Sequence, residues 1–266
     1  MMFTRNNLAV LAVAVVALAA PTARADILLP NVDFILNLRN FDMGSTYSME
    51  QPPVKTDGPI GGEDGEDGWG IFKVTAITDT SANVLWADGQ DGMELTGVFY
   101  GLVDTGASWD GSEWKITGKG LQVDFWHNPK GSFNPAPGSL GRIGVSGYQG
   151  ITNVGGTKIL SAETRAPGVF GLPEFQSTVN VAGFGDSRAW ADVITTVGTQ
   201  PANFSTGSQL GGTDLYLSSD VFFPGTVADW QFESSDLVKG RFVPEPFSLG
   251  LLGIGAVALL RRRRRA

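Results

Sequence analysis

Glycine and proline interrupt this chain so often that long helices have little room to form. The sequence of 266 residues holds 36 glycines and 14 prolines, and the glycine share is nearly double the ordinary value of about 7%. Between residues 26 and 242, hardly any stretch is long enough for an uninterrupted amphipathic helix. Because both residue types favour turns, the sequence predicts short extended segments joined by many turns, and hence an all-β fold.

Alternation of apolar and polar residues supports this prediction. Leu121, Val123 and Phe125 occupy alternate positions, as expected for a strand with one buried face. Similar patterns predict further strands at residues 27–38, 69–77, 82–86, 94–102, 113–117, 175–183, 189–197, 214–217, 227–232 and 237–243. Long loops rich in glycine and proline are predicted at 42–68 and 127–156. About ten short strands without a repeat of fixed period favour a single antiparallel β-sandwich or jelly-roll-like domain.

The first 25 residues have the layout of a secretory signal peptide. Arg5 supplies a positive flank, residues 8–20 form a short apolar run, and Ala23 and Ala25 fit the small-x-small pattern of a signal-peptidase site. The apolar run is shorter than a membrane-spanning helix. We therefore expect residues 1–25 to be removed during export, and the extracellular domain to comprise residues 26–242.

Residues 243–266 combine three features in a fixed order. A rigid step is followed by an uncharged apolar segment, residues 247–260, which we expect to be a hydrophobic helix, and then by a basic block. The step consists of Val243, Pro244, Glu245 and Pro246, and the basic block consists of Arg261, Arg262, Arg263, Arg264 and Arg265. The arginines hold the end of the segment on the cytoplasmic side, because guanidinium groups cross a hydrocarbon core only at high cost. The segment is shorter than a straight spanning helix of about 20 residues, which snorkelling and local thinning partly offset.

This layout resembles the PEP-CTERM sorting signal of exported bacterial proteins. The resemblance is confined to residues 243–266. It implies an exosortase-like processing enzyme as a partner, transient insertion into the inner membrane, and delivery to the cell surface or extracellular matrix of bacteria that make exopolysaccharide. A permanent short anchor is the alternative outcome. A buried core helix or a basic tail for nucleic acid is the plainer interpretation of the same residues.

The body is strongly acidic once the two end segments are set aside. Without Arg5, Arg24, Arg261–Arg265 and Glu245, residues 26–242 carry 12 basic and 26 acidic residues, a net charge of −14 compared with −8 for the whole chain. Such a surface repels nucleic acid, so we expect no nucleic-acid partner. The chain has no cysteine, so the exported body relies on its core rather than on disulfides.

Residues that could carry catalysis are sparse. His127 is the single histidine, no nucleophile-elbow motif accompanies it, and we expect it to be an exposed residue at a loop edge. Four carboxylates lie in or beside predicted strands, namely Asp104, Glu113, Asp124 and Asp192. A solvated sheet face carries such residues without catalysis, and a glycosidase pair is defined by the separation of its carboxyls. The sequence therefore predicts a protein that is not an enzyme.

An acidic, glycine-containing loop is the candidate metal site. Glu63, Asp64, Glu66 and Asp67 supply hard oxygen ligands of the kind that Ca²⁺ prefers. The ligand spacing of an EF-hand is missing, and a solvated acidic turn explains the same residues. No other cofactor is indicated, because the usual histidine and cysteine ligands of zinc are lacking.

Tryptophan is the other candidate for ligand contact. The chain has seven tryptophans, and most are expected in the core. Trp109 lies in a turn-like context, so we expect it to be exposed, where a flat indole can stack on a sugar ring. We therefore expect an exported protein of structural or adhesive type that associates with exopolysaccharide. A carbohydrate-binding module is the first alternative, and a secreted glycoside hydrolase is the second.

Overall fold

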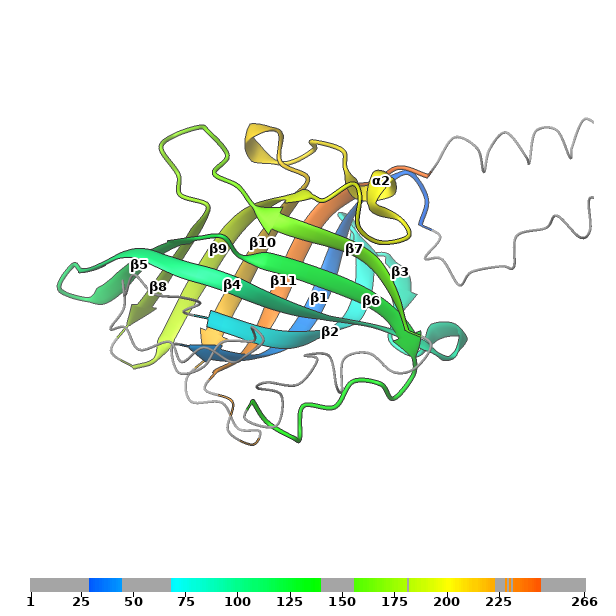
Figure 1. The fold of residues 1–266 in the computed structure, drawn as a ribbon, viewed down its shortest axis with the longest axis horizontal. Helices are drawn as coiled ribbons and strands as arrows, with labels where there is room; N and C mark the ends of the chain where they lie inside the picture. The colour runs from blue at the N-terminus through cyan, green and yellow to red at the C-terminus, as the bar shows by residue number, and fades with distance from the viewer. Residues whose placement is uncertain are drawn as a thin grey trace, which may run out of the picture.

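The computed structural model describes residues 29–44, 68–139, 156–180, 182–222, 228, 230 and 232–244. They form one antiparallel sheet of eleven strands (Figure 1), so the all-β prediction is confirmed. The strands are β1 (Val32–Gly44), β2 (Gly68–Asp79), β3 (Val84–Ala87), β4 (Met93–Trp109), β5 (Glu113–Lys119), β6 (Gln122–Pro129), β7 (Thr157–Thr164), β8 (Phe175–Asn180), β9 (Phe184–Val193), β10 (Leu215–Phe222) and β11 (Phe232–Phe242). Single helical turns occur at Gln90–Gly92 (η1), Pro201–Phe204 (α2) and Leu210–Gly212 (η2).

The sheet closes on itself. From β1, hydrogen-bonded pairs run through β11, β10, β9, β7, β6 and β4 to β2, and β2 pairs with β1 again. These eight strands form a ring, and Figure 1 shows them tilted around a common interior. A closed sheet of this size is just wide enough to be filled by side chains or to hold one small ligand.

Strand β4 changes its partner halfway along. Residues 93–100 pair with β6, and residues 103–109 pair with β5. Because β5 pairs with β8 and β8 pairs with β9, a second route closes the ring at this end. Two glycines with positive φ mark the change, Gly101 at 78° and Gly120 at 75°. A Cβ atom on Gly101 would lie 3.0 Å from the carbonyl oxygen of Gly120, so the two backbones meet at close range.

The structure differs from the predicted β-sandwich or jelly-roll-like domain in how its sheet closes. A sandwich leaves free edges on both of its sheets, but the pairings of β2 with β4 and of β8 with β9 join the strands of this chain into one closed sheet. Among the described strands, only β3 lies outside the closed sheet, where it is hydrogen-bonded to β2. The alternation of residues along a strand reveals its two faces and says nothing about which strand becomes its neighbour.

Several strand boundaries also differ from the prediction. No strand is predicted between residues 156 and 175, where β7 lies, because a register shift against β6 buries both Ile159 and Leu160 and breaks the period of two. Strand β4 continues to Trp109 rather than ending at residue 102. Strand β11 runs from Phe232 to Phe242 and includes residues 233–236, which the prediction placed between two strands. Most of the strand predicted at 227–232 lies outside the described residues.

One end of the ring is packed tightly. Phe204 of α2 lies edge-on against Phe34, with ring centroids 5.7 Å apart, and against Phe242 at 5.1 Å. All three side chains are buried, together with Leu215. A second buried cluster, which includes Phe41, Trp69, Trp126 and Trp230, is separate from the main core around Phe34 and Phe242. There the indole nitrogen of Trp230 donates a hydrogen bond to the carbonyl oxygen of Pro135 at 3.0 Å.

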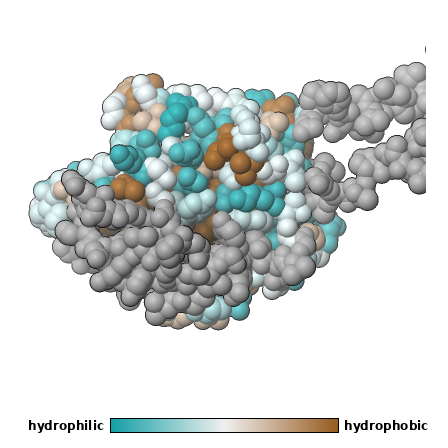
Figure 2. All heavy atoms as spheres, in the orientation of Figure 1, coloured by the Kyte–Doolittle hydropathy of each residue, from teal (hydrophilic) through white to brown (hydrophobic). Residues whose placement is uncertain are grey.

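Several predicted segments lie outside the described residues. They are the signal peptide, the acidic loop with Glu63, Asp64, Glu66 and Asp67, and the tail from Glu245 onward with its expected hydrophobic helix. Within the described residues, no helix is long and apolar enough to cross a membrane. On the face shown in Figure 2, apolar residues occur in small groups between polar ones.

Candidate functional site

A cavity of about 330 Å³ lies inside the ring, toward the end closed by β5 and β8. Small side chains on one wall leave this space open. Ser177 on β8, Ser187 on β9 and Ser219 on β10 are neighbours in register and all line the cavity, as does Ala189. Apolar side chains bound much of the rest, including Phe72, Phe99, Leu102 and Phe175. The cavity is therefore mainly apolar, with a polar wall.

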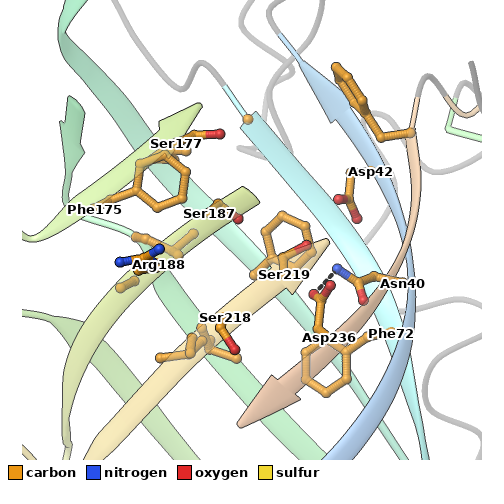
Figure 3. A pocket seen from close by; sticks show the side chains of 18 of the residues that line it. Asn40, Asp42, Phe72, Phe175, Ser177, Ser187, Arg188, Ser218, Ser219 and Asp236 are labelled. Atoms are coloured by element: carbon orange, nitrogen blue, oxygen red, sulfur yellow. Dashed lines mark hydrogen bonds between the residues drawn. The ribbon is translucent and has the colours of Figure 1, made fainter. Parts of the chain in front are cut away.

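A polar cluster closes one side of the cavity (Figure 3). Asn40 and Asp42 belong to β1, and Asp236 belongs to the neighbouring β11. The side-chain amide of Asn40, which is 2% exposed, donates a hydrogen bond to Oδ2 of Asp236. The Oδ1 atoms of Asn40, Asp42 and Asp236 are buried without a hydrogen-bond partner among the described residues. Buried acceptors without partners are rare in folded proteins, because their desolvation is not compensated.

Both carboxyls of this cluster are harder to ionise than an exposed aspartate. Burial raises the pKa of Asp42 well above its ordinary value and the negative charge of Asp236 raises it further, although hydrogen bonds from Asn40 and Ser234 oppose the shift. Burial also raises the pKa of Asp236 to about 6, although hydrogen bonds from Ser219 and Asn40 oppose the shift. The cluster therefore holds protons at a pH where an exposed aspartate would be ionised.

Two other charged residues line the cavity. Asp104 comes from β4, and Arg188 comes from β9. The guanidinium of Arg188 is already paired, since its Nη2 lies 3.0 Å from Oδ2 of Asp186. The described residues thus supply no cation to the carboxyls of Asp42 and Asp236.

The residues considered for catalysis do not gather here. His127 is 7% exposed and belongs to β6, so the expected exposed loop-edge position is wrong. Its strand runs on to Pro129, into the loop predicted at 127–156, and buries the histidine. Asp124 is buried too, with Nζ of Lys158 at 2.7 Å from its Oδ2. Among the four carboxylates named from the sequence, Asp104 alone lines the cavity.

Trp109 is exposed, as the sequence predicts, with 42% of its surface accessible. It has an exposed partner that the sequence did not indicate, Trp114 on β5. The two ring centroids lie 5.7 Å apart. Trp114 and the cavity-lining Ile116 are two residues apart on one strand, so the tryptophan pair lies on the same sheet face as the cavity wall.

The chain leaves the ring at its packed end, at the start of the predicted sorting signal. The backbone N–H of Val243 donates a hydrogen bond to the carbonyl oxygen of Asn203 in α2, at 2.8 Å. Val243 and Pro244 are the last described residues of the step, and Glu245 lies beyond them. No group of three or more potential metal ligands occurs within the described residues, and the proposed calcium ligands lie outside them.

The polar cluster was not predicted, although the sequence contains a pattern that indicates it. The predicted first strand places Phe34, Leu36 and Leu38 on one face, and the same parity continues to Asn40 and Asp42. Polar residues that continue an apolar face point into the core, where they need partners.

The fold and the site together define an all-β protein whose single closed sheet surrounds a mainly apolar cavity with buried carboxyls. No protein-family model, curated protein or solved structure matches the chain.

Proposed function

We propose that this protein is an exported binding protein that holds one small, mainly apolar ligand inside its closed sheet. The observation that carries this proposal is the cavity of about 330 Å³ with its apolar lining and its single polar cluster. Ligand pockets typically have volumes of about 300–1,000 Å³ and combine an apolar lining with a few polar groups that orient the ligand. The mainly apolar lining favours binding of an apolar ligand, so binding rather than catalysis is the function proposed.

Calorimetric titration with straight-chain alcohols tests this proposal. We expect 1-octanol to bind saturably with one site per chain, because its methylenes replace water against the apolar lining. Each buried methylene contributes about 0.8 kcal/mol, so 1-butanol should bind much more weakly than 1-octanol. Trp69 lines the cavity, and its fluorescence provides a second readout. The proposal would be overturned if the binding heat of 1-octanol did not saturate, or if 1-butanol and 1-octanol bound with equal affinity.

We further propose that residues 243–266 deliver this body to the cell surface or extracellular matrix, where an exosortase-like enzyme removes the tail. The Pro-Glu-Pro step follows β11 directly, and its two prolines disfavour both helix and ladder pairing. Mass spectrometry of protein purified from its native cells should find a C-terminus near Pro244 to Pro246. Surface-exposed protein that still carries residues 251–260 would contradict processing.

Binding to exopolysaccharide at the cell surface is a second candidate function, which the exposed Trp109–Trp114 pair favours. Replacing either tryptophan with alanine should weaken retention in gels containing a neutral polysaccharide by about fivefold, since each lost stacking contact is worth roughly 1 kcal/mol. Phe170 is 89% exposed elsewhere in the structure, so Phe170→Ala is the matched control. Equal retention of all three variants and the original protein would exclude the tryptophan pair as the glycan site.

A further inference from the structure

The polar cluster beside the cavity contains three buried acceptors that have no hydrogen-bond partner among the described residues, which are the Oδ1 atoms of Asn40, Asp42 and Asp236. All three residues line the cavity, and Figure 3 shows them on adjacent strands facing the same space. We infer that the ligand is a small apolar amine, whose primary ammonium group is held by these three oxygens while its apolar body fills the cavity. This inference rests on the proposed function, because it names the chemistry of the ligand for that same cavity.

The number of acceptors favours an ammonium group over other polar groups. A primary ammonium has three N–H donors and no acceptor, whereas a hydroxyl has one donor and a carboxylate has none. The side-chain amide of Asn40 is oriented by its hydrogen bond to Oδ2 of Asp236, which leaves the Asn40 oxygen as an acceptor. A ligand carboxylate would instead add a third acid to two buried ones, and like charges in a buried site repel strongly.

The charges around the cluster also favour a cation. Asp104 on β4 lines the same cavity, and the negative charge of Asp220 on β10 acts on Asp236. Arg188 on β9 is paired with Asp186, and β2 contributes no charged residue to the lining. The surrounding elements therefore contribute more negative than positive charge to this part of the cavity, and a positively charged ligand would compensate it.

Protons and the ammonium group compete for the same carboxyls. Burial keeps the carboxyls of Asp42 and Asp236 protonated to an unusually high pH, with the pKa of Asp236 near 6. A bound ammonium stabilises the ionised forms, so amine binding releases protons. Amine affinity should therefore fall as the pH is lowered from 7.5 to 5, while the affinity for an uncharged alcohol of the same length should stay constant.

Three probes of equal chain length separate the possibilities. We expect 1-aminooctane to bind at least tenfold more tightly than 1-octanol at pH 7.5, and octanoate to bind most weakly. The three titrations are done by calorimetry on the intact chain, at concentrations below those at which the probes form micelles. At pH 5 the preference for the amine over the alcohol should shrink about tenfold.

Carboxyl-to-amide variants locate the cation site. Asp42→Asn and Asp236→Asn should each reduce amine affinity at least tenfold and leave octanol affinity within a factor of two. Asp33→Asn is the matched control, because Asp33 lies on the same strand β1 with an exposed side chain. Both variants should fold, since an uncharged amide replaces a carboxyl whose ionisation burial opposes, and denaturation midpoints at pH 7.5 check this.

The outcomes separate this inference from the proposed function. If none of the three probes binds, the proposed function fails, and the inference fails with it. If octanol binds as tightly as the amine, the cavity is a binding site, but the ammonium inference is wrong. The inference is also overturned if the amine preference survives in Asp42→Asn and Asp236→Asn.

Discussion

Replacing Lys73 with methionine is expected to lower the free energy of unfolding by about 3–5 kcal/mol, the typical cost of breaking a buried ion pair by removing one partner. The ammonium of Lys73 lies 2.8 Å from Oδ2 of Asp88 and 3.2 Å from Oε2 of Glu94. Glu94 is completely buried. Burial opposes the charge on Lys73, but hydrogen bonds to Asp88 and Glu94 outweigh this effect and raise its pKa. Methionine would leave the Glu94 carboxylate buried without a counter-ion.

Urea denaturation at neutral pH measures this loss, and two further variants interpret it. Lys115→Met removes an ion pair with Asp110 in which the lysine side chain is 52% exposed and the aspartate side chain is 34% exposed. Its loss of stability should be smaller, because exposed pairs contribute less than about 1 kcal/mol. Adding Glu94→Gln to Lys73→Met should restore part of the stability, because it removes the stranded charge. A loss below about 1 kcal/mol for Lys73→Met would show that water or a neighbouring group already solvates Glu94.

Replacing Ser187 with phenylalanine is expected to weaken octanol binding by about 100-fold, which corresponds to about 3 kcal/mol. Ser187 lines the cavity and lies between two other lining serines, Ser177 on β8 and Ser219 on β10. A benzyl group at this position would occupy space that the ligand needs. Because it enters an existing cavity rather than a filled core, its cost to stability should stay at the low end of the roughly 1–3 kcal/mol usual for added bulk.

The same substitution on the outer face is the control for this prediction. Ser235 is exposed, and its neighbour Ser234 on β11 is buried. Ser235→Phe should therefore bind octanol as the original protein does. Unchanged binding by Ser187→Phe would mean that octanol occupies another site, and the cavity would lose its assignment as the binding site.

The fold class followed from local sequence, while the closure of the sheet did not. Two local features correctly indicated β-strands. They are the spacing of glycine and proline and the alternation of residues from Leu121 to Phe125. The pairing of β1 with β11 joins residues about 200 positions apart, for example Val32 with Phe242. No local pattern specifies such a partner. It depends on the packing of the whole interior.

The candidate site was missed for a related reason. The strands predicted at 227–232 and 237–243 omit Ser234, Ser235 and Asp236, yet these three residues belong to β11. Their polarity reflects the cavity and its surroundings rather than a loop. Trp109 was predicted to be exposed because its neighbours suggest a turn, whereas Trp114 lies within a predicted strand and gave no such signal.

The two ends of the ring point in opposite directions, and under the proposed cell-surface delivery this would set the orientation of the body. Register pairs Val32 with Phe242 at the packed end and Asp42 with Phe232 at the cavity end. Both ends of the described chain, at Leu29 and Pro244, emerge beside α2 (Figure 1). A body tethered through Pro244 would therefore turn its cavity outward, toward the surroundings of the cell. Solutes from the environment would then reach the cavity end, with Asp42 and Asp236, without crossing the membrane.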